Sequence, residues 1–206
     1  MAGPDADFWQ ARFESGATPW DRGATSPQLV RWIASGELAP CRILVPGCGS
    51  GYEVADLAAA GFHVTGLDYA PAAVRRTREL LASLPAPVAA NARVVQADAL
   101  AWSPVALLDA VYEQACLCAL HPDVWVDYAT RLHRWLRPGG HLFALFAQLP
   151  RPEAAVGRII GPPYHCDING MRALFPDRLW DWPKPPYERV AHPLGMAELA
   201  VVLLRR

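Results

Sequence analysis

The stretch RILVPGCGSGYEV, residues Arg42 to Val54, decides the fold of this chain. A short apolar run ends at Pro46, and three glycines follow at alternate positions, Gly47, Gly49 and Gly51. Such a run is typical of a buried parallel strand, and the residues after the glycines have helical periodicity. Because glycine has no side chain, the backbone here can turn tightly and lie directly against a bound molecule. The stretch therefore predicts a strand, a tight turn and a helix, with a ligand at the turn.

Apolar runs and helical patterns alternate along most of the chain. The expected strands are residues 41–47, 62–69, 92–100, 107–114, 141–149, 187–193 and 198–206. The expected helices are residues 52–61, 70–84 and 122–140, with a short late helix that begins at residue 171. Such alternation pairs strands in parallel through right-handed crossovers. We therefore predict one α/β domain over residues 1–206, with a doubly wound, mostly parallel, seven-stranded sheet and helices on both faces.

Two segments lie outside this alternation. One is the N-terminal segment, residues 1–40, which contains Trp9, Trp20 and Trp32, and the other is the loop at residues 150–170. Long irregular segments beside a rigid sheet are common places for lids and specificity loops. We therefore expect an N-terminal helical lid, and a second loop that closes over the ligand.

The composition restricts the class of ligand. The 206 residues carry 19 basic and 20 acidic side chains, a formal charge of -1, which argues against a nucleic-acid partner. We find no signal-peptide pattern and no membrane-spanning apolar run, so we expect a cytoplasmic protein without a membrane partner. An odd number of cysteines, five, indicates free thiols instead of a disulfide framework, and no metal site is expected. We expect a monomer that binds small molecules.

Acidic residues mark the ends of the next two expected strands. In doubly wound sheets, ligands bind at the carboxyl ends of the strands. Asp68 ends the second strand, where a carboxylate can accept hydrogen bonds from both hydroxyls of a ribose, and Asp98 ends the third, beside the place for an adenine amino group. The spacing is G-x-G-x-G, and Tyr52 occupies the third small position of a dinucleotide fingerprint. The pattern therefore favours S-adenosylmethionine over a dinucleotide.

Longer segments resemble one known family. FWQARFESGATPWDRG (Phe8–Gly23), RILVPGCGSGYEVADLAAAGFHVTGLDYAPAAV (Arg42–Val74) and YEQACLCALHP (Tyr112–Pro122), followed by GPPY (Gly161–Tyr164), are similar to the thiopurine S-methyltransferase superfamily. The N-terminal segment looks closest to its bacterial and plant-type thiol and halide branch. The resemblance implies a Rossmann-like class I methyltransferase fold that uses S-adenosylmethionine.

The expected site residues follow from the resemblance, from a position at the end of a strand, or from a position in the loop at residues 150–170. The expected cofactor residues are Trp9, Trp20, Gly47, Gly49, Asp68, Tyr69, Asp98, Ala99 and Glu113. The expected acceptor-binding residues are Phe13, Gln114 and Tyr164. Gln114 stands where the mammalian enzymes have an arginine beside the substrate. This departure disfavours acidic thiopurines and leaves room for a small, less charged acceptor.

The implied chemistry needs no catalytic residue. The methyl carbon of the sulfonium is already electrophilic, so the protein must align the acceptor, exclude water and hold the cofactor rigid. Aromatic faces such as Trp20 can stabilise the sulfonium charge. His121 is expected to cap a helix start, and Cys48 to be a small packing residue under the cofactor.

Three functional interpretations remain open. The first is methyl transfer to a small soft nucleophile, such as a thiol, a thiopurine-like sulfur, a selenium or tellurium compound, or a halide. The second is transfer to an oxygen or nitrogen acceptor, which needs a general base, with Glu113 or His121 as candidate. The third is a catalytically silent regulatory protein that binds S-adenosylmethionine. A dinucleotide oxidoreductase is disfavoured by the glycine spacing.

Overall fold

The computed structural model describes residues 3–206. Its strands are β1 Arg42–Pro46, β2 His63–Asp68, β3 Ala92–Gln96, β4 Leu108–Gln114, β5 Leu136–Gln148, β6 Trp180–Asp181, β7 Glu188–Ala191 and β8 Ala197–Arg205. Its α-helices are α1 Ala6–Ser15, α2 Pro27–Ala34, α3 Tyr52–Ala59, α4 Pro71–Ala82, α5 Ala86–Ala89, α6 Cys116–Ala119, α7 Trp125–Trp135 and α8 Ile168–Leu174. Two 3-10 helices, η1 Pro122–Val124 and η2 Pro152–Val156, complete the described elements.

The strands form one sheet in the order β3-β2-β1-β4-β5-β8-β6. Strands β1 to β5 pair in parallel, whereas β8 runs antiparallel to β5. The sheet has eight strands where the sequence predicted seven, because the two-residue strand β6 was not expected. Since β6 and β7 both pair with β8 on the side away from β5, the sheet has seven strand positions.

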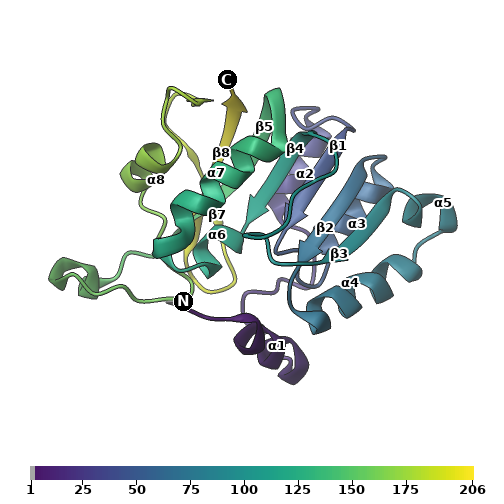
Figure 1. Cartoon of the computed structure of the whole chain (residues 1–206), viewed down its shortest axis with the longest axis horizontal. Coiled ribbons are helices and arrows are strands. Elements are labelled where there is room, and N and C mark those ends of the chain that lie inside the picture. The colour runs from purple at the N-terminus through teal and green to yellow at the C-terminus, as the bar shows by residue number, and fades with distance from the viewer. Residues whose placement is uncertain (1–2) are drawn as a thin grey trace.

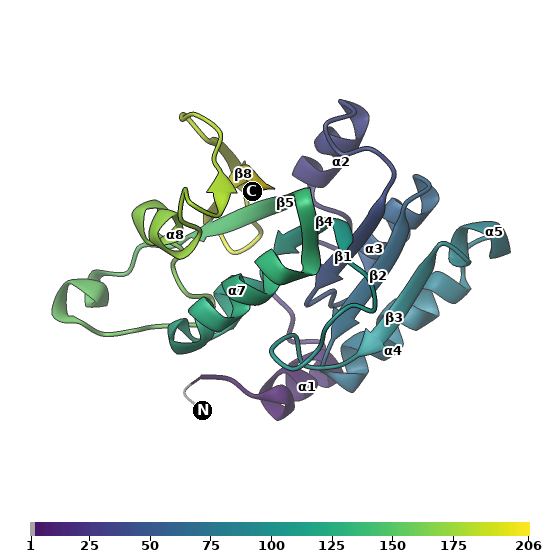
Figure 2. The same cartoon turned by 45° about the horizontal axis from the view of Figure 1, so that its top comes forward.

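Helices cover both faces of the sheet, as predicted (Figures 1 and 2). On one face, α2 and α3 pack on inward side chains of β1, β2 and β4, with Leu29, Trp32 and Leu57 buried. On the other face, α7 and α8 pack on β4, β5 and β8 around Tyr128 and Phe175. Strand side chains alternate between the two clusters, as the pleat requires.

Two boundaries differ from the sequence prediction. The helix expected over residues 122–140 ends at Trp135, and Pro138-Gly139-Gly140 belong to the irregular start of β5, where the register to β4 shifts. The N-terminal segment outside the core is also shorter than the expected residues 1–40, because α2 is part of the core. Trp32 is 4% exposed there, so only the segment before Pro27 lies outside the packed layers.

The parallel strands all finish at the same end of the sheet. Figure 1 shows α1 beside this end, whereas β8 carries the C-terminus to the opposite end. Among the described residues, no helix combines the length and apolar character needed to cross a bilayer. The fold therefore gathers α1, the β1–α3 corner and the turns after β2, β3 and β4 in one place.

Candidate functional site

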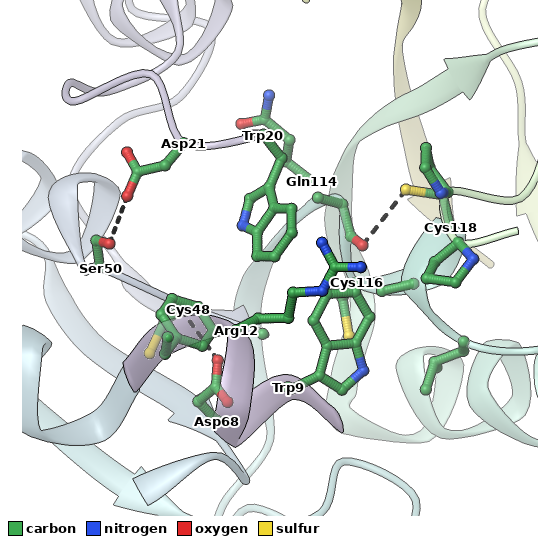
Figure 3. Close-up of a pocket in the computed structure, with 18 of the residues that line it drawn as sticks. Trp9, Arg12, Trp20, Asp21, Cys48, Ser50, Asp68, Gln114, Cys116 and Cys118 are labelled. Atoms are coloured by element: carbon green, nitrogen blue, oxygen red, sulfur yellow. Dashed lines mark hydrogen bonds between the residues drawn. The ribbon is translucent and has the colours of Figure 1, made fainter. Parts of the chain in front are cut away.

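A cavity of about 540 Å³ opens at the carboxyl ends of the parallel strands (Figure 3). This volume is within the range of about 300–1,000 Å³ that is usual for small-molecule sites. Its walls come from α1, residues 19–24, the β1–α3 corner, the ends of β2 to β4, residues 161–163 and the turn between β7 and β8. The cavity therefore joins distant parts of the chain at the place where the sequence predicted a ligand.

The glycine corner forms one wall of this cavity. Gly47 and Gly49 both line it, and their φ angles of 62° and 53° lie in the left-handed region that favours glycine. Gly51 has a different function, because it is not among the cavity-lining residues. A Cβ atom there would lie 2.5 Å from the Cγ2 atom of Thr77 on α4. The first two glycines leave the backbone bare toward the cavity, and the third lets α3 approach α4.

Asp68 connects the corner to the end of β2. Its Oδ2 accepts a hydrogen bond from the Gly49 N–H at 3.0 Å, and its Oδ1 accepts one from the Ala70 N–H at 2.9 Å. Burial raises the pKa of Asp68, and the N–H groups of Ala70, Gly49 and Tyr69 oppose that shift. Each carboxylate oxygen has a further lone pair. Asp68 therefore keeps capacity to accept hydrogen bonds from two neighbouring hydroxyls in the cavity.

The turn after β3 supplies the next part of the wall. Asp98 and Ala99 line the cavity beside Tyr69. The Oδ1 atom of Asp98 accepts a hydrogen bond from the Leu100 N–H at 2.8 Å, which fixes the carboxylate within its turn. The second carboxylate oxygen has no protein partner among the described hydrogen bonds. This part of the wall can therefore accept a hydrogen bond from an amino group.

The N-terminal segment covers the cavity with aromatic rings. The ring centroids of Trp9 and Trp20 lie 5.3 Å apart, edge to face, and Phe13 lies 6.1 Å from Trp20. Figure 3 shows the side chain of Arg12 extending into the same cavity. The segment is attached to the corner because the Ser50 hydroxyl donates a 2.6 Å hydrogen bond to Asp21.

Gln114, at the end of β4, lies on the opposite side of the cavity. Its amide group is held by protein partners. The Oε1 atom accepts a hydrogen bond from the Tyr112 hydroxyl at 2.6 Å, and the Nε2 atom donates to both oxygens of Glu198 at 3.1 and 3.0 Å. Gln114 therefore shapes this wall, with few hydrogen bonds left for a ligand.

Several residues of this side were not expected from the sequence. They come from residues 22 and 116–120 and from the β7–β8 turn, and they include Arg22, Cys116, Cys118, Leu120, His192 and Met196. Pro162 also lines the cavity, and it belongs to the loop at residues 150–170 that was expected to close over the ligand. The sequence around residue 192 resembles an ordinary hairpin turn. Only the pairing of β7 with β8, and of β8 with β5, brings that turn to the cavity.

Two expected residues, Glu113 and Tyr164, are not among the cavity-lining residues. Glu113 is 2% exposed, with one oxygen accepting from the Leu117 N–H, and burial raises its pKa to about 8. Because side chains alternate along a strand, Glu113 and Gln114 point to opposite faces, and only Gln114 reaches the cavity. The Tyr164 ring is also buried, and it packs against His121.

His121 and Cys48 behave as the sequence predicted. The Nδ1 atom of His121 accepts a hydrogen bond from the Asp123 N–H at 3.3 Å and caps η1. The Cys48 side chain is 5% exposed, with its sulfur 3.8 Å from the Thr77 hydroxyl. In the described part of the chain, all five cysteines are free, and no group of three or more potential ligands is placed to hold a metal ion.

Comparisons with known proteins place this chain among its relatives. The profile of the thiopurine S-methyltransferase (TPMT) family matches residues 4–188. A probable thiol methyltransferase of Arabidopsis thaliana is 32% identical over 94% of this chain and 75% of that protein. A thiopurine S-methyltransferase of Vibrio vulnificus is 28% identical over 83% of this chain and 81% of its own length.

A solved structure shares the fold. The magnesium protoporphyrin IX methyltransferase of Synechocystis PCC 6803, crystallised with bound SAM, superposes with a TM-score of 0.73 over 100% of both chains, at 16% identity. At this identity, the likeness concerns the fold alone. Together with the family match, it confirms the predicted class I methyltransferase fold. The chain therefore belongs to the thiopurine S-methyltransferase family, and its cofactor is S-adenosylmethionine.

Proposed function

We propose that this protein transfers a methyl group from S-adenosylmethionine to a small soft nucleophile by direct in-line displacement. The acceptor classes are thiols, thiopurine-like sulfur, selenium or tellurium compounds, and halides. One observation carries the proposal: the glycine corner and Asp68 open into the same cavity as a wall of apolar and sulfur-containing side chains. The relatives described above are a probable thiol methyltransferase and a thiopurine methyltransferase, which agrees with such an acceptor.

The corner side of the cavity fits the methyl donor. Asp68 has free lone pairs for the ribose hydroxyls, and Asp98 for the adenine amino group. The bare backbone at Gly47 and Gly49 leaves room for the amino-acid part, and Arg12 offers a charge for its carboxylate. When bound, the cofactor supplies an electrophilic methyl group on a positively charged sulfur.

The protein's contribution is orientation and exclusion of water. Trp9, Trp20 and Phe13 form an aromatic cover, and an aromatic face stabilises a nearby cation by about 0.5–2 kcal/mol. On the opposite wall, Cys118 and Met196 offer polarizable sulfur atoms to a soft acceptor. An aligned acceptor in a dry cavity needs no further activation when it already carries a reactive lone pair.

The geometry does not support a base-dependent reaction with an oxygen or nitrogen acceptor. Glu113 does not line the cavity, and the Nδ1 atom of His121 is used as a cap. His192 does line it, but its Nδ1 atom accepts a hydrogen bond from the Leu194 N–H at 3.2 Å. None of these three residues, Glu113, His121 and His192, therefore presents a free lone pair to the cavity. We also propose a cytoplasmic monomer, supported by the single sheet and the unpaired thiols.

A nucleophile panel tests the proposal. The protein is incubated with S-adenosylmethionine and, separately, iodide, thiocyanate, thiophenol, 6-mercaptopurine or dimethyl selenide, and S-adenosylhomocysteine is measured. We expect turnover with at least one acceptor. Asp68→Asn keeps the shape of the side chain and removes its charge, so donor affinity should fall about tenfold or more. Absence of product with the whole panel, or unchanged donor affinity in Asp68→Asn, would refute the proposal.

A further inference from the structure

Three segments meet at the side of the cavity away from the glycine corner. Arg22 comes from the N-terminal segment, Gln114 from the end of β4, and His192 from the β7–β8 turn. Behind them lies Glu198 on β8, which is 1% exposed and is not a cavity-lining residue. This cluster places ionisable groups beside the apolar acceptor wall.

The hydrogen bonds of the cluster leave part of Arg22 unused. Its Nη2 group donates to the Ala191 carbonyl oxygen at 2.6 Å and to Glu198 at 3.4 Å. Its Nε atom is buried and has no hydrogen-bond partner among the described residues. A guanidinium group has five N–H donors in a planar fork. Arg22 therefore lines the cavity with a cationic side chain, and one of its buried donors is unpaired within the described part of the chain.

His192 does not compete with Arg22 as a cation. Burial, together with the charge of Arg22, lowers the pKa of His192 to about 4, so the ring is neutral at physiological pH. Because its Nδ1 atom accepts from Leu194, the ring proton lies on Nε2. This wall therefore offers one full positive charge and one neutral N–H donor.

We propose that the acceptor binds to Arg22 as an anion. Glu198 is the positioning residue, because its own charge determines how much of the positive charge of Arg22 the acceptor experiences. The inference rests on the proposed function and narrows the acceptor to small soft anions, such as thiolates and halides. Gln114 alone predicted a less charged acceptor. In the structure, Arg22, which lies 92 residues before Gln114 in the chain, places a positive charge on this side of the cavity.

Glu198 determines the expected pH dependence. Burial raises its pKa to about 7, and the hydrogen bonds from Gln114 and Arg22 oppose that shift. The other ionisable groups coupled to Glu198 are Glu53 on α3, Tyr112 and Glu113 on β4, Cys118 on α6 and Cys166 before α8. Burial keeps the tyrosine and both thiols uncharged at neutral pH. When Glu198 takes up a proton below about pH 7, Arg22 loses its counter-charge, and an anion binds more tightly.

Iodide is the probe for this inference, because it is an anion at every pH. Arg22→Gln should raise the KM for iodide about tenfold or more and leave the Kd for S-adenosylhomocysteine within about twofold. Arg31→Gln is the matched control, since it breaks an exposed ion pair with Glu188 that lies outside the cavity. Its iodide kinetics should equal those of the wild type.

Glu198→Gln provides a second test that does not depend on the folding of the Arg22 variant. In the wild type, kcat/KM for iodide should rise as the pH falls through about 7, and the rise should be absent in Glu198→Gln. An unchanged KM in Arg22→Gln, equal pH profiles for wild type and Glu198→Gln, or a parallel loss of S-adenosylhomocysteine affinity would overturn the inference. The last result would assign Arg22 to the donor's carboxylate. If the wild type itself forms no product with the whole panel, the proposed function fails first.

Discussion

Gly49 and Gly51 lie two residues apart and should respond to substitution in different ways. At Gly51, with φ 85°, an added Cβ would lie 2.5 Å from Cγ2 and 2.7 Å from Oγ1 of Thr77. At Gly49, with φ 53°, an added Cβ would meet only the Phe13 ring, at an ordinary 3.5 Å, besides a backbone oxygen at 3.9 Å. We therefore compare Gly51→Ala with Gly49→Ala.

The expected magnitudes follow from these contacts. A left-handed backbone disfavours alanine by about 1–2 kcal/mol in both variants. In Gly51→Ala, the collision with Thr77 adds about 1–3 kcal/mol of overpacking. The free energy of unfolding should therefore fall by about 2–5 kcal/mol in Gly51→Ala and by about 1–2 kcal/mol in Gly49→Ala. Only the methyl group at residue 49 occupies the cavity wall, so Gly49→Ala should lose more donor affinity.

Urea unfolding measures the stability, and calorimetry with S-adenosylhomocysteine measures the affinity. Thr77→Ser provides the internal control, because it removes the Cγ2 atom and keeps the hydroxyl that donates to the Gly49 carbonyl oxygen at 2.8 Å. It should restore part of the stability lost in Gly51→Ala and none of that lost in Gly49→Ala. Equal effects of Thr77→Ser in both backgrounds, or a smaller loss in Gly51→Ala than in Gly49→Ala, would refute the reasoning.

Three further predictions concern the N-terminal cover and the buried acid. Trp20→Ala should weaken the binding of S-adenosylmethionine more than that of S-adenosylhomocysteine, which lacks the sulfonium charge, by about 0.5–2 kcal/mol in titrations. Trp20→Phe keeps an aromatic face, so it should preserve most of the preference for the charged donor. Ser50→Ala removes the hydrogen bond to Asp21, and it should raise the donor Kd about 2- to 10-fold and speed proteolysis before residue 27. Glu113 holds its proton to about pH 8 when folded, against 4.5 ordinarily, so stability should fall as the pH rises between these values. Glu113→Gln should flatten that slope by about 1.4 kcal/mol per pH unit, measured by urea unfolding at several pH values.

Local patterns were sufficient to predict the first half of the sheet. Strands β1, β2 and β3 are short apolar runs, and Asp68 and Asp98 stand at or just after the ends of two of them. Other elements depend on distant partners. Strand β6 has two residues and exists because Trp180 and Asp181 pair with β8. Pro138-Gly139-Gly140 has the composition of a helix stop, and its inclusion in β5 depends on pairing near Leu108.

The candidate site divides in the same way. The corner side was predictable, because Gly47, Gly49 and Asp68 lie within one strand–helix–strand unit. Glu113 was expected beside the cofactor but does not line the cavity, and strand alternation already excludes its sharing a face with Gln114. Arg22 and His192 had no local signal, since an arginine in a loop and a histidine in a hairpin are common in any protein. Their meeting requires β8 to lie beside β5.

Three consecutive residues link the two sides of the cavity. Trp20 packs on Trp9 of α1, Asp21 accepts the hydrogen bond from Ser50 at the glycine corner, and Arg22 binds Glu198 on β8. A backbone shift at residue 21 therefore moves an aromatic face on the donor side and a guanidinium on the acceptor side together. Because a bound donor would fix Trp20 and the corner, it would also fix the position of Arg22. We therefore expect the donor to bind first and the anion second.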